Sequence, residues 1–89
     1  MPMMKRWTVD IYIDEDAAHT YAEARLRSGA DTHLIGVGRA RLNPQDQDVP
    51  EIGDELAAAR ALNDLGHRLL LATAADIEAI THQPVDLRG

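Results

Sequence analysis

The sequence predicts an α+β fold in which a three-stranded antiparallel sheet is followed by one long helix and one short helix. Three observations support this prediction. Apolar and polar residues alternate over most of residues 6–42, the small residues of that region fall together on one face, and from about residue 50 the apolar spacing changes to three or four residues. A chain of 89 residues suffices for one core, so we expect a single domain over residues 1–89.

Three alternating segments account for the predicted sheet. The acidic run Asp14-Glu15-Asp16 ends the first segment, and the turn-forming residues 28–31 separate the second from the third. Such short connections favour an antiparallel meander. The three alternating segments are residues 6–13, 19–27 and 33–42.

The second and third segments carry mainly small residues on one face. These small residues are Ala22, Ala24, Gly36, Gly38 and Ala40. A helix can approach such a surface closely, because no large side chain stands between its backbone and the sheet. We expect the long helix to lie here, with Trp7, Val9 and the other large side chains of the first segment along one side. Replacing Gly36 or Gly38 with valine is expected to overpack this contact, at a cost of about 1–3 kcal/mol.

The second half of the chain has helical spacing. Leucine, isoleucine and alanine recur every three or four positions over about residues 50–72, which predicts a long amphipathic helix. Asp48 and Glu51 have the spacing of a capping box at its start. Thr73 is typical of a new N-cap, so a short second helix is predicted over about residues 74–81.

Composition restricts the environment and the assembly of the chain. It contains no cysteine, no phenylalanine and one tryptophan, and its net charge is −6 at pH 7. Lys5 and Arg6 near the start are not followed by an apolar run, so we expect no secretory signal, no membrane association and a cytoplasmic location. Because the core is small, we expect a homodimer to add buried surface.

The motifs for catalysis and ligand binding are weak. The Gly36-Val37-Gly38 segment lacks the third glycine and the following helix of a dinucleotide-binding loop. The four histidines do not have the spacing of metal ligands. Ser28 is the only serine and has no neighbouring base. We therefore expect no enzymatic activity, no cofactor, no metal and no small-molecule substrate.

The strongest candidate site is a set of arginines on the sheet face opposite the helix. Arg25 and Arg27 lie on the second segment, Arg39 and Arg41 on the third, and Tyr21 among them. If these strands pair, the four guanidinium groups form a cluster that could bind RNA phosphates while the tyrosine stacks on a base. The same residue types are enriched in protein interfaces, where nearby carboxylates pair with the arginines.

Several longer motifs resemble those of a family of short actinobacterial proteins catalogued as a domain of unknown function. They are Trp7-Thr8-Val9-Asp10-Ile11, Gly36-Val37-Gly38-x-Ala40-Arg41-Leu42-Asn43-Pro44, Val49-Pro50-Glu51-Ile52-Gly53-Asp54-Glu55-Leu56 and Asp76-Ile77-Glu78-Ala79. The resemblance covers about residues 7–85. It implies a double-stranded-RNA-binding-domain-like fold, usually dimeric, with dormancy and hypoxia association for some members and a likeness to ribosome hibernation factors. It implies no catalytic residues.

Two functions follow as expectations. The first is a noncatalytic stress or dormancy protein that binds the ribosome or structured RNA through Arg25, Arg27, Arg39 and Arg41. The alternative is a protein-interaction or structural homodimer in which the same face meets an acidic partner or its own copy, with no nucleic-acid binding. Salt-dependent binding to ribosomal subunits that is lost when Arg39 and Arg41 are replaced would distinguish the first from the second.

Overall fold

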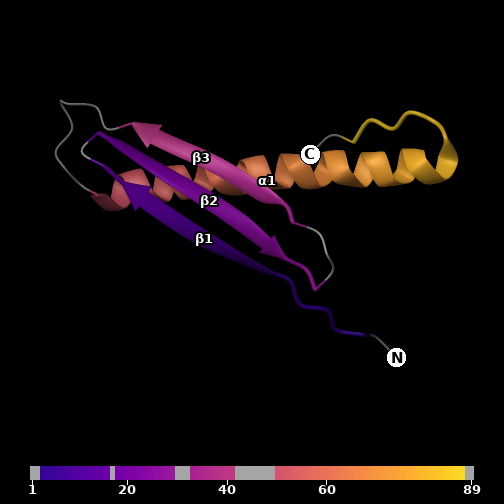
Figure 1. The fold of residues 1–89 in the computed structure, drawn as a ribbon, viewed down its shortest axis with the longest axis horizontal. Coiled ribbons are helices and arrows are strands. Elements are labelled where there is room, and N and C mark those ends of the chain that lie inside the picture. Colours follow the sequence, from indigo (N-terminus) through magenta and orange to yellow (C-terminus); the bar gives the residue numbers. More distant parts are fainter. Residues whose placement is uncertain (1–2, 17, 30–32, 42–49, 88–89) are drawn as a thin grey trace.

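The computed structural model describes residues 3–16, 18–29, 33–41 and 50–87. Within these residues the chain forms three strands and one helix (Figure 1). The sheet is antiparallel with the order β1-β2-β3, which confirms the α+β class and the predicted meander. The elements are β1 (Thr8–Glu15), β2 (His19–Arg27), β3 (Ile35–Arg41) and α1 (Pro50–Thr81).

The connection between β1 and β2 is held by an aspartate turn. The Oδ1 atom of Asp16 accepts hydrogen bonds from the backbone N–H groups of Ala18 and His19, at 2.9 and 2.8 Å. These two bonds favour the ionised carboxylate and lower the pKa of Asp16. Asp16 therefore forms the hairpin turn, whereas the expectation that the whole acidic run ends the strand is wrong, because Asp14 and Glu15 still belong to β1.

The core lies between α1 and one face of β2 and β3. Among the described residues, the buried set contains no side chain larger than leucine. Ala57, Ala61 and Leu65 recur every four residues on the helix face that meets the sheet. Their counterparts on the sheet are Ala22, Ala24, Leu26 and Ala40.

Gly36 and Gly38 allow the helix backbone to touch the strand, as the sequence predicts. A Cβ atom at Gly38 would meet the backbone of Ala57 and Ala61 and would stand 2.8 Å from the carbonyl carbon of Arg60. A Cβ atom at Gly36 would meet Ala61 and would stand 2.7 Å from the Cα atom of Leu65. Both glycines are buried, so the predicted small-residue surface is confirmed.

The predicted pair of helices is wrong, because α1 runs unbroken for 32 residues, or about 48 Å. The hydroxyl of Thr73 does not cap a new helix. It donates to the C=O of Leu69, one turn back, at 2.9 Å, so the residue is accommodated inside the helix. The helix ends where His82 takes a left-handed φ of 59° and donates its N–H to the C=O of Glu78. The predicted capping box includes Asp48, which lies outside the described residues.

α1 lies over β2 and β3 and leaves the inner side of β1 largely open. In Figure 1 the helix crosses the sheet diagonally, and its C-terminal half extends beyond the strands. Val9, Ile11 and Ile13 pair with Leu26, Ala24 and Ala22, so they lie on the helix side of the sheet. They are nevertheless exposed, and Trp7 is 55% exposed. The expected flanking position of these large side chains is correct, but they are not enclosed.

Side chains of α1 cover the free edge of β3. The Oδ2 atom of Asp64 accepts hydrogen bonds from the backbone N–H of Val37, at 2.8 Å, and from Nε of Arg68, at 3.0 Å. The Val37 bond and, after it, the Arg68 bond lower the pKa of Asp64. One turn earlier, Arg60 donates from Nη1 to the C=O of Arg39 at 2.6 Å. The helix is therefore tied to the outermost strand by polar contacts.

Candidate functional site

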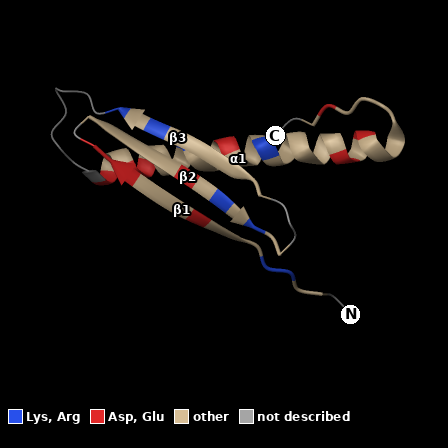
Figure 2. Cartoon of the chain, in the orientation of Figure 1, with Lys and Arg blue, Asp and Glu red and all other residues tan. Residues whose placement is uncertain are grey.

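The outer face of the sheet, which is the face opposite α1, carries the residues singled out from the sequence. The strand pairing places Tyr21, Arg25 and Arg27 of β2 on this face with Arg39 and Arg41 of β3. It also carries three carboxylates, those of Asp10, Asp14 and Glu23. Four arginines against three acids leave this face almost neutral. In Figure 2 the acidic positions of the sheet lie on β1 and β2, and the basic positions lie on β2 and β3.

The four arginines do not form one cluster. Arg25 pairs with Ile35 at the start of β3, whereas Tyr21 pairs with Arg39 and His19 with Arg41 at its end. Four residues along β2 separate the two positions, which is about 13 Å. The hypothesis of a four-guanidinium cluster is therefore replaced by two arginine pairs at opposite ends of the outer face.

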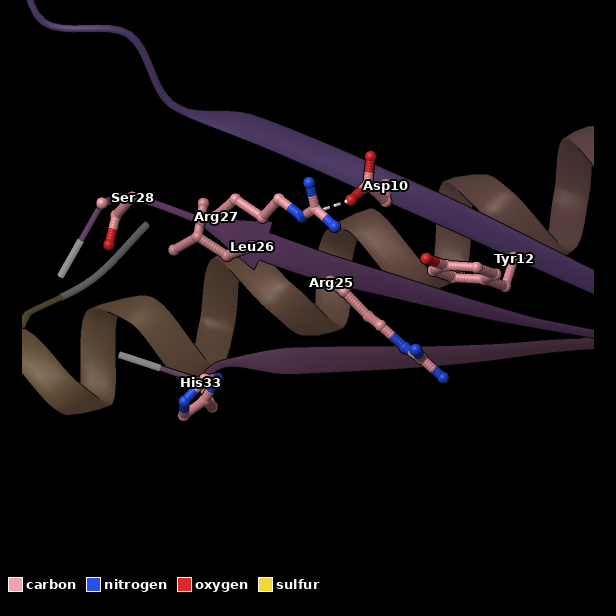
Figure 3. A pocket seen from close by; sticks show the side chains of 8 residues that line it. Asp10, Tyr12, Arg25, Leu26, Arg27, Ser28 and His33 are labelled. Atoms are coloured by element: carbon pink, nitrogen blue, oxygen red, sulfur yellow. Dashed lines mark ion pairs between the residues drawn. The ribbon is translucent and has the colours of Figure 1, made fainter. Parts of the chain in front are cut away.

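The pair Arg25 and Arg27 borders a shallow groove (Figure 3). Nε of Arg27 lies 2.8 Å from Oδ2 of Asp10 across the strand pair, and this ion pair is drawn as a dashed line in Figure 3. Both side chains are well exposed, so the pair adds little stability. Its consequence is electrostatic, because a charge that would meet a phosphate is already paired. The remaining lining includes Ser28, His33 and Tyr12.

Glu23 organises the centre of the outer face. Its carboxylate accepts hydrogen bonds from the hydroxyl of Tyr21, at 2.9 Å, and from Nε and Nη2 of Arg25, at 3.1 and 2.8 Å. The Arg25 bonds, and then the Tyr21 bond, lower the pKa of Glu23. The same contact raises the pKa of Tyr21, because the hydroxyl proton is shared with an anion. Arg25 is thus also paired with a carboxylate of its own face.

Two guanidinium groups stack on tyrosine rings. The Cζ atom of Arg25 lies 4.2 Å from the ring centre of Tyr12, and that of Arg39 lies 5.6 Å from the ring centre of Tyr21. Tyr12 was not among the residues singled out from the sequence. The alternation of the first segment already places it opposite the apolar face, and this signal could have identified it.

Arg39 and Arg41 make up the less neutralised end of the outer face. In the part of the chain that the structure describes, neither guanidinium forms an ion pair with a carboxylate. Both residues are exposed, and the backbone of Arg39 is held by Arg60. An anionic ligand would therefore bind more readily at the Arg39 end of the outer face than at the Arg25 end, where the arginines are already paired.

Two further structural findings concern the described residues only. No three side chains of the histidine, aspartate and glutamate types gather there closely enough to hold a metal ion. The one helix falls short of the apolar character that a bilayer-crossing helix needs.

Comparison with known proteins finds several mycobacterial proteins that are similar to this chain. The family model described as Rv2632c-like matches residues 5–86. "Uncharacterized protein MT1780" of Mycobacterium tuberculosis (strain CDC 1551 / Oshkosh) is 59% identical over 85 residues, which cover 96% of this chain and 89% of that protein. "Uncharacterized protein Rv2632c" of strain ATCC 25618 / H37Rv is 53% identical over 81 residues, with coverage of 91% and 86%.

A solved structure supports the same relationship. The crystal structure of Rv2632c aligns with a TM-score of 0.82 and 51% sequence identity, covering 93% of this chain and 98% of that chain. At this identity the shared strands and helix reflect common ancestry as well as a common fold. The chain therefore belongs to the Rv2632c-like family.

Proposed function

We propose that this chain is a noncatalytic protein-interaction module that acts as a homodimer in the cytoplasm and binds a partner protein through the outer face of its sheet. One observation carries this proposal. Arg25 and Arg27 are paired with Glu23 and Asp10 on the same face, so the surface offers tyrosine, arginine and matched charge instead of concentrated positive charge. That combination is typical of protein interfaces.

The near-neutral outer face also weighs against a polyanion as the main partner. Affinity for RNA depends on the number of phosphates that lysine and arginine neutralise. Engaging Arg25 or Arg27 would require breaking an existing ion pair, and the chain as a whole has a net charge of −6. Ile35 and Val37 contribute apolar surface beside the arginines, which a protein partner can bury.

Structured RNA or the ribosome is the second candidate, favoured by the Arg39 end of the outer face. There an arginine stacks on Tyr21 and a second arginine lies two residues on, without a carboxylate partner among the described residues. A stacked ring beside free guanidinium groups suits a splayed base and its phosphate. This candidate would include the stress and dormancy role and the likeness to double-stranded-RNA-binding domains and ribosome hibernation factors that the resemblance implies.

The two candidates can be separated by photocrosslinking in mycobacterial cells. A benzophenone amino acid placed at Val37 on the outer face should give a discrete adduct that protease removes and ribonuclease leaves intact. The same label at Leu71, an exposed residue on the overhanging part of α1, serves as the matched control.

A ribonuclease-sensitive adduct at Val37 would overturn the protein-interaction proposal and support the RNA candidate. In that case, binding to ribosomal subunits should fall with rising salt and be lost in the Arg39→Ala, Arg41→Ala double variant. The Arg25→Ala, Arg27→Ala double variant should then bind almost as well as the parent, because these arginines are already paired.

A further inference from the structure

The two free edges of the sheet are treated differently by the rest of the molecule. On β3 the outward N–H of Val37 and the outward C=O of Arg39 are hydrogen-bonded by Asp64 and Arg60 of α1. The helix leans over this side of the sheet and touches β1 only slightly. The edge of β3 is thus partly protected against pairing with another strand, whereas no residue that the structure describes covers β1 in the same way.

The outward groups of β1 can be assigned from the hairpin. The N–H of Asp16 donates to the C=O of His19, so the even-numbered residues of β1 bond to β2. Val9, Ile11 and Ile13 therefore direct their N–H and C=O groups to the open edge. No residue in the described ranges hydrogen-bonds these outward groups. The edge offers a regular row of unused donors and acceptors along a strand of 8 residues.

The same three residues form an apolar strip on the helix side of the sheet. Each is about 40% exposed, because α1 does not reach over them. A groove lined by Trp7, Leu26 and Leu69 continues this strip between the sheet and the helix. Leu62 stands two turns before Leu69 on the same side of α1 and is also exposed. The open edge is therefore flanked by apolar surface, which a bound strand would bury.

The sequence of β1 is complementary to itself in the antiparallel direction. With Ile11 opposite Ile11 of a second copy, Val9 meets Ile13, and Arg6 meets Asp16. Like charges do not face each other in this register, whereas a shift by two residues places Asp10 opposite Asp10, or Asp10 opposite Asp14. Because hydrogen-bonded pairs involve the outward groups, the three apolar pairs would exchange six backbone hydrogen bonds.

We propose that the free edge of β1 binds β1 of a second copy in this register, which joins the two sheets into one six-stranded antiparallel sheet. This inference rests on the proposed homodimer and specifies its interface. Both helices then lie on the same face of the joined sheet, and the apolar strips of the two β1 strands meet at its centre. The two outer faces form one continuous surface for the partner.

Two sets of variants test this interface. Ile11→Lys places a charge opposite its own copy and should raise the dimer dissociation constant at least about tenfold in sedimentation equilibrium. Ile35→Lys is the matched control, because Ile35 is 41% exposed on the other edge strand and Ile11 is 40% exposed. It should leave the dissociation constant unchanged.

Ile11→Cys gives a second measurement that does not require a disrupted dimer. A hydrogen-bonded antiparallel pair holds its Cα atoms about 5.5 Å apart, within the range of a disulfide. The natural sequence has no cysteine, so mild oxidation should produce a covalent dimer of Ile11→Cys and none of Ile35→Cys. This test decides the proposal if Ile11→Lys fails to fold by circular dichroism.

The outcomes separate this inference from the proposed function. A dimeric parent that survives Ile11→Lys, or whose Ile11→Cys form does not crosslink, would overturn the β1 interface and leave the homodimer in place. A parent that is monomeric at micromolar concentration would overturn both the β1 interface and the homodimer. The free edge of β1 could then pair only with a strand of another protein.

Discussion

Replacing Gly38 with alanine is the sharpest test of how α1 is seated on the sheet. The added Cβ would meet main-chain atoms of Ala57 and Ala61 and would lie 2.8 Å from the carbonyl carbon of Arg60. Ordinary contact begins near 3.4 Å, and a helix backbone cannot rotate away as a side chain can. The whole helix must therefore retreat by more than about half an ångström.

The retreat loosens every contact of the small-residue core. A gap of about 0.5–1 Å forfeits a quarter to a half of the dispersion energy of the atoms that face it. We therefore expect Gly38→Ala to cost about 3 kcal/mol, the upper end of the usual range for overpacking. A chain of this length has about 4–13 kcal/mol of total stability, so the loss is a large fraction.

Urea denaturation followed by circular dichroism measures this cost. At a slope of about 1.5 kcal/mol per molar urea, the midpoint should fall by about 2 M. Gly66→Ala is the control, because among the described residues no atom outside the neighbouring turns of α1 itself lies within 4 Å of the Cβ that it adds. It should raise stability by about 0.5–1 kcal/mol. An unchanged midpoint for Gly38→Ala would refute the close helix–strand contact.

Three other predictions concern the helix and the polar contacts. Ala74→Pro should cost about 3 kcal/mol of local helix stability, because α1 is continuous at this position. The loss should be visible as a weaker helical circular dichroism signal. A helix that started after a Thr73 cap would instead tolerate proline at its first position. Because the pKa of Asp64 is lowered in the fold, its ionised carboxylate stabilises the fold above about pH 3.8, and this contribution is lost as the pH falls further. The urea midpoint of Asp64→Asn should therefore depend less on pH below about 4 than the midpoint of the parent. Equal pH dependence of the two midpoints would contradict this. In a Tyr12→Phe background, ultraviolet titration should show the pKa of Tyr21 above 10, and Glu23→Gln should lower it; an unmoved titration would exclude the Tyr21–Glu23 hydrogen bond.

Much of the fold could be predicted because it depends on local patterns. Alternation assigned Val9, Ala24 and Gly38 to the helix side of the sheet, and side-chain size alone placed the helix over the glycines. The end of α1 could not be predicted in the same way. Thr73 suits both an N-cap and a helix interior, and only the bond to Leu69 shows which state holds.

The candidate site was predicted by face but not by arrangement. The alternation correctly grouped the four arginines on one side of the sheet. Their separation follows from topology, since Arg27 and Arg41 each end a strand and antiparallel neighbours end at opposite sides. The ion pairs could not be assigned from residue types alone, because the register decides which carboxylate faces each arginine. Arg27 meets Asp10 diagonally, while Thr8 stands directly opposite it.

The alanine and glycine seam between α1 and the sheet has a thermodynamic consequence. Small side chains expose little hydrocarbon to water when the protein unfolds. The heat-capacity change of unfolding should therefore be smaller than the value usual for a chain of this length, which is about 1.1–1.3 kcal/mol/K. A smaller change flattens the stability curve over temperature. The protein should then lose stability gradually on both cooling and heating, and its stability should vary little across the range in which a bacterium grows.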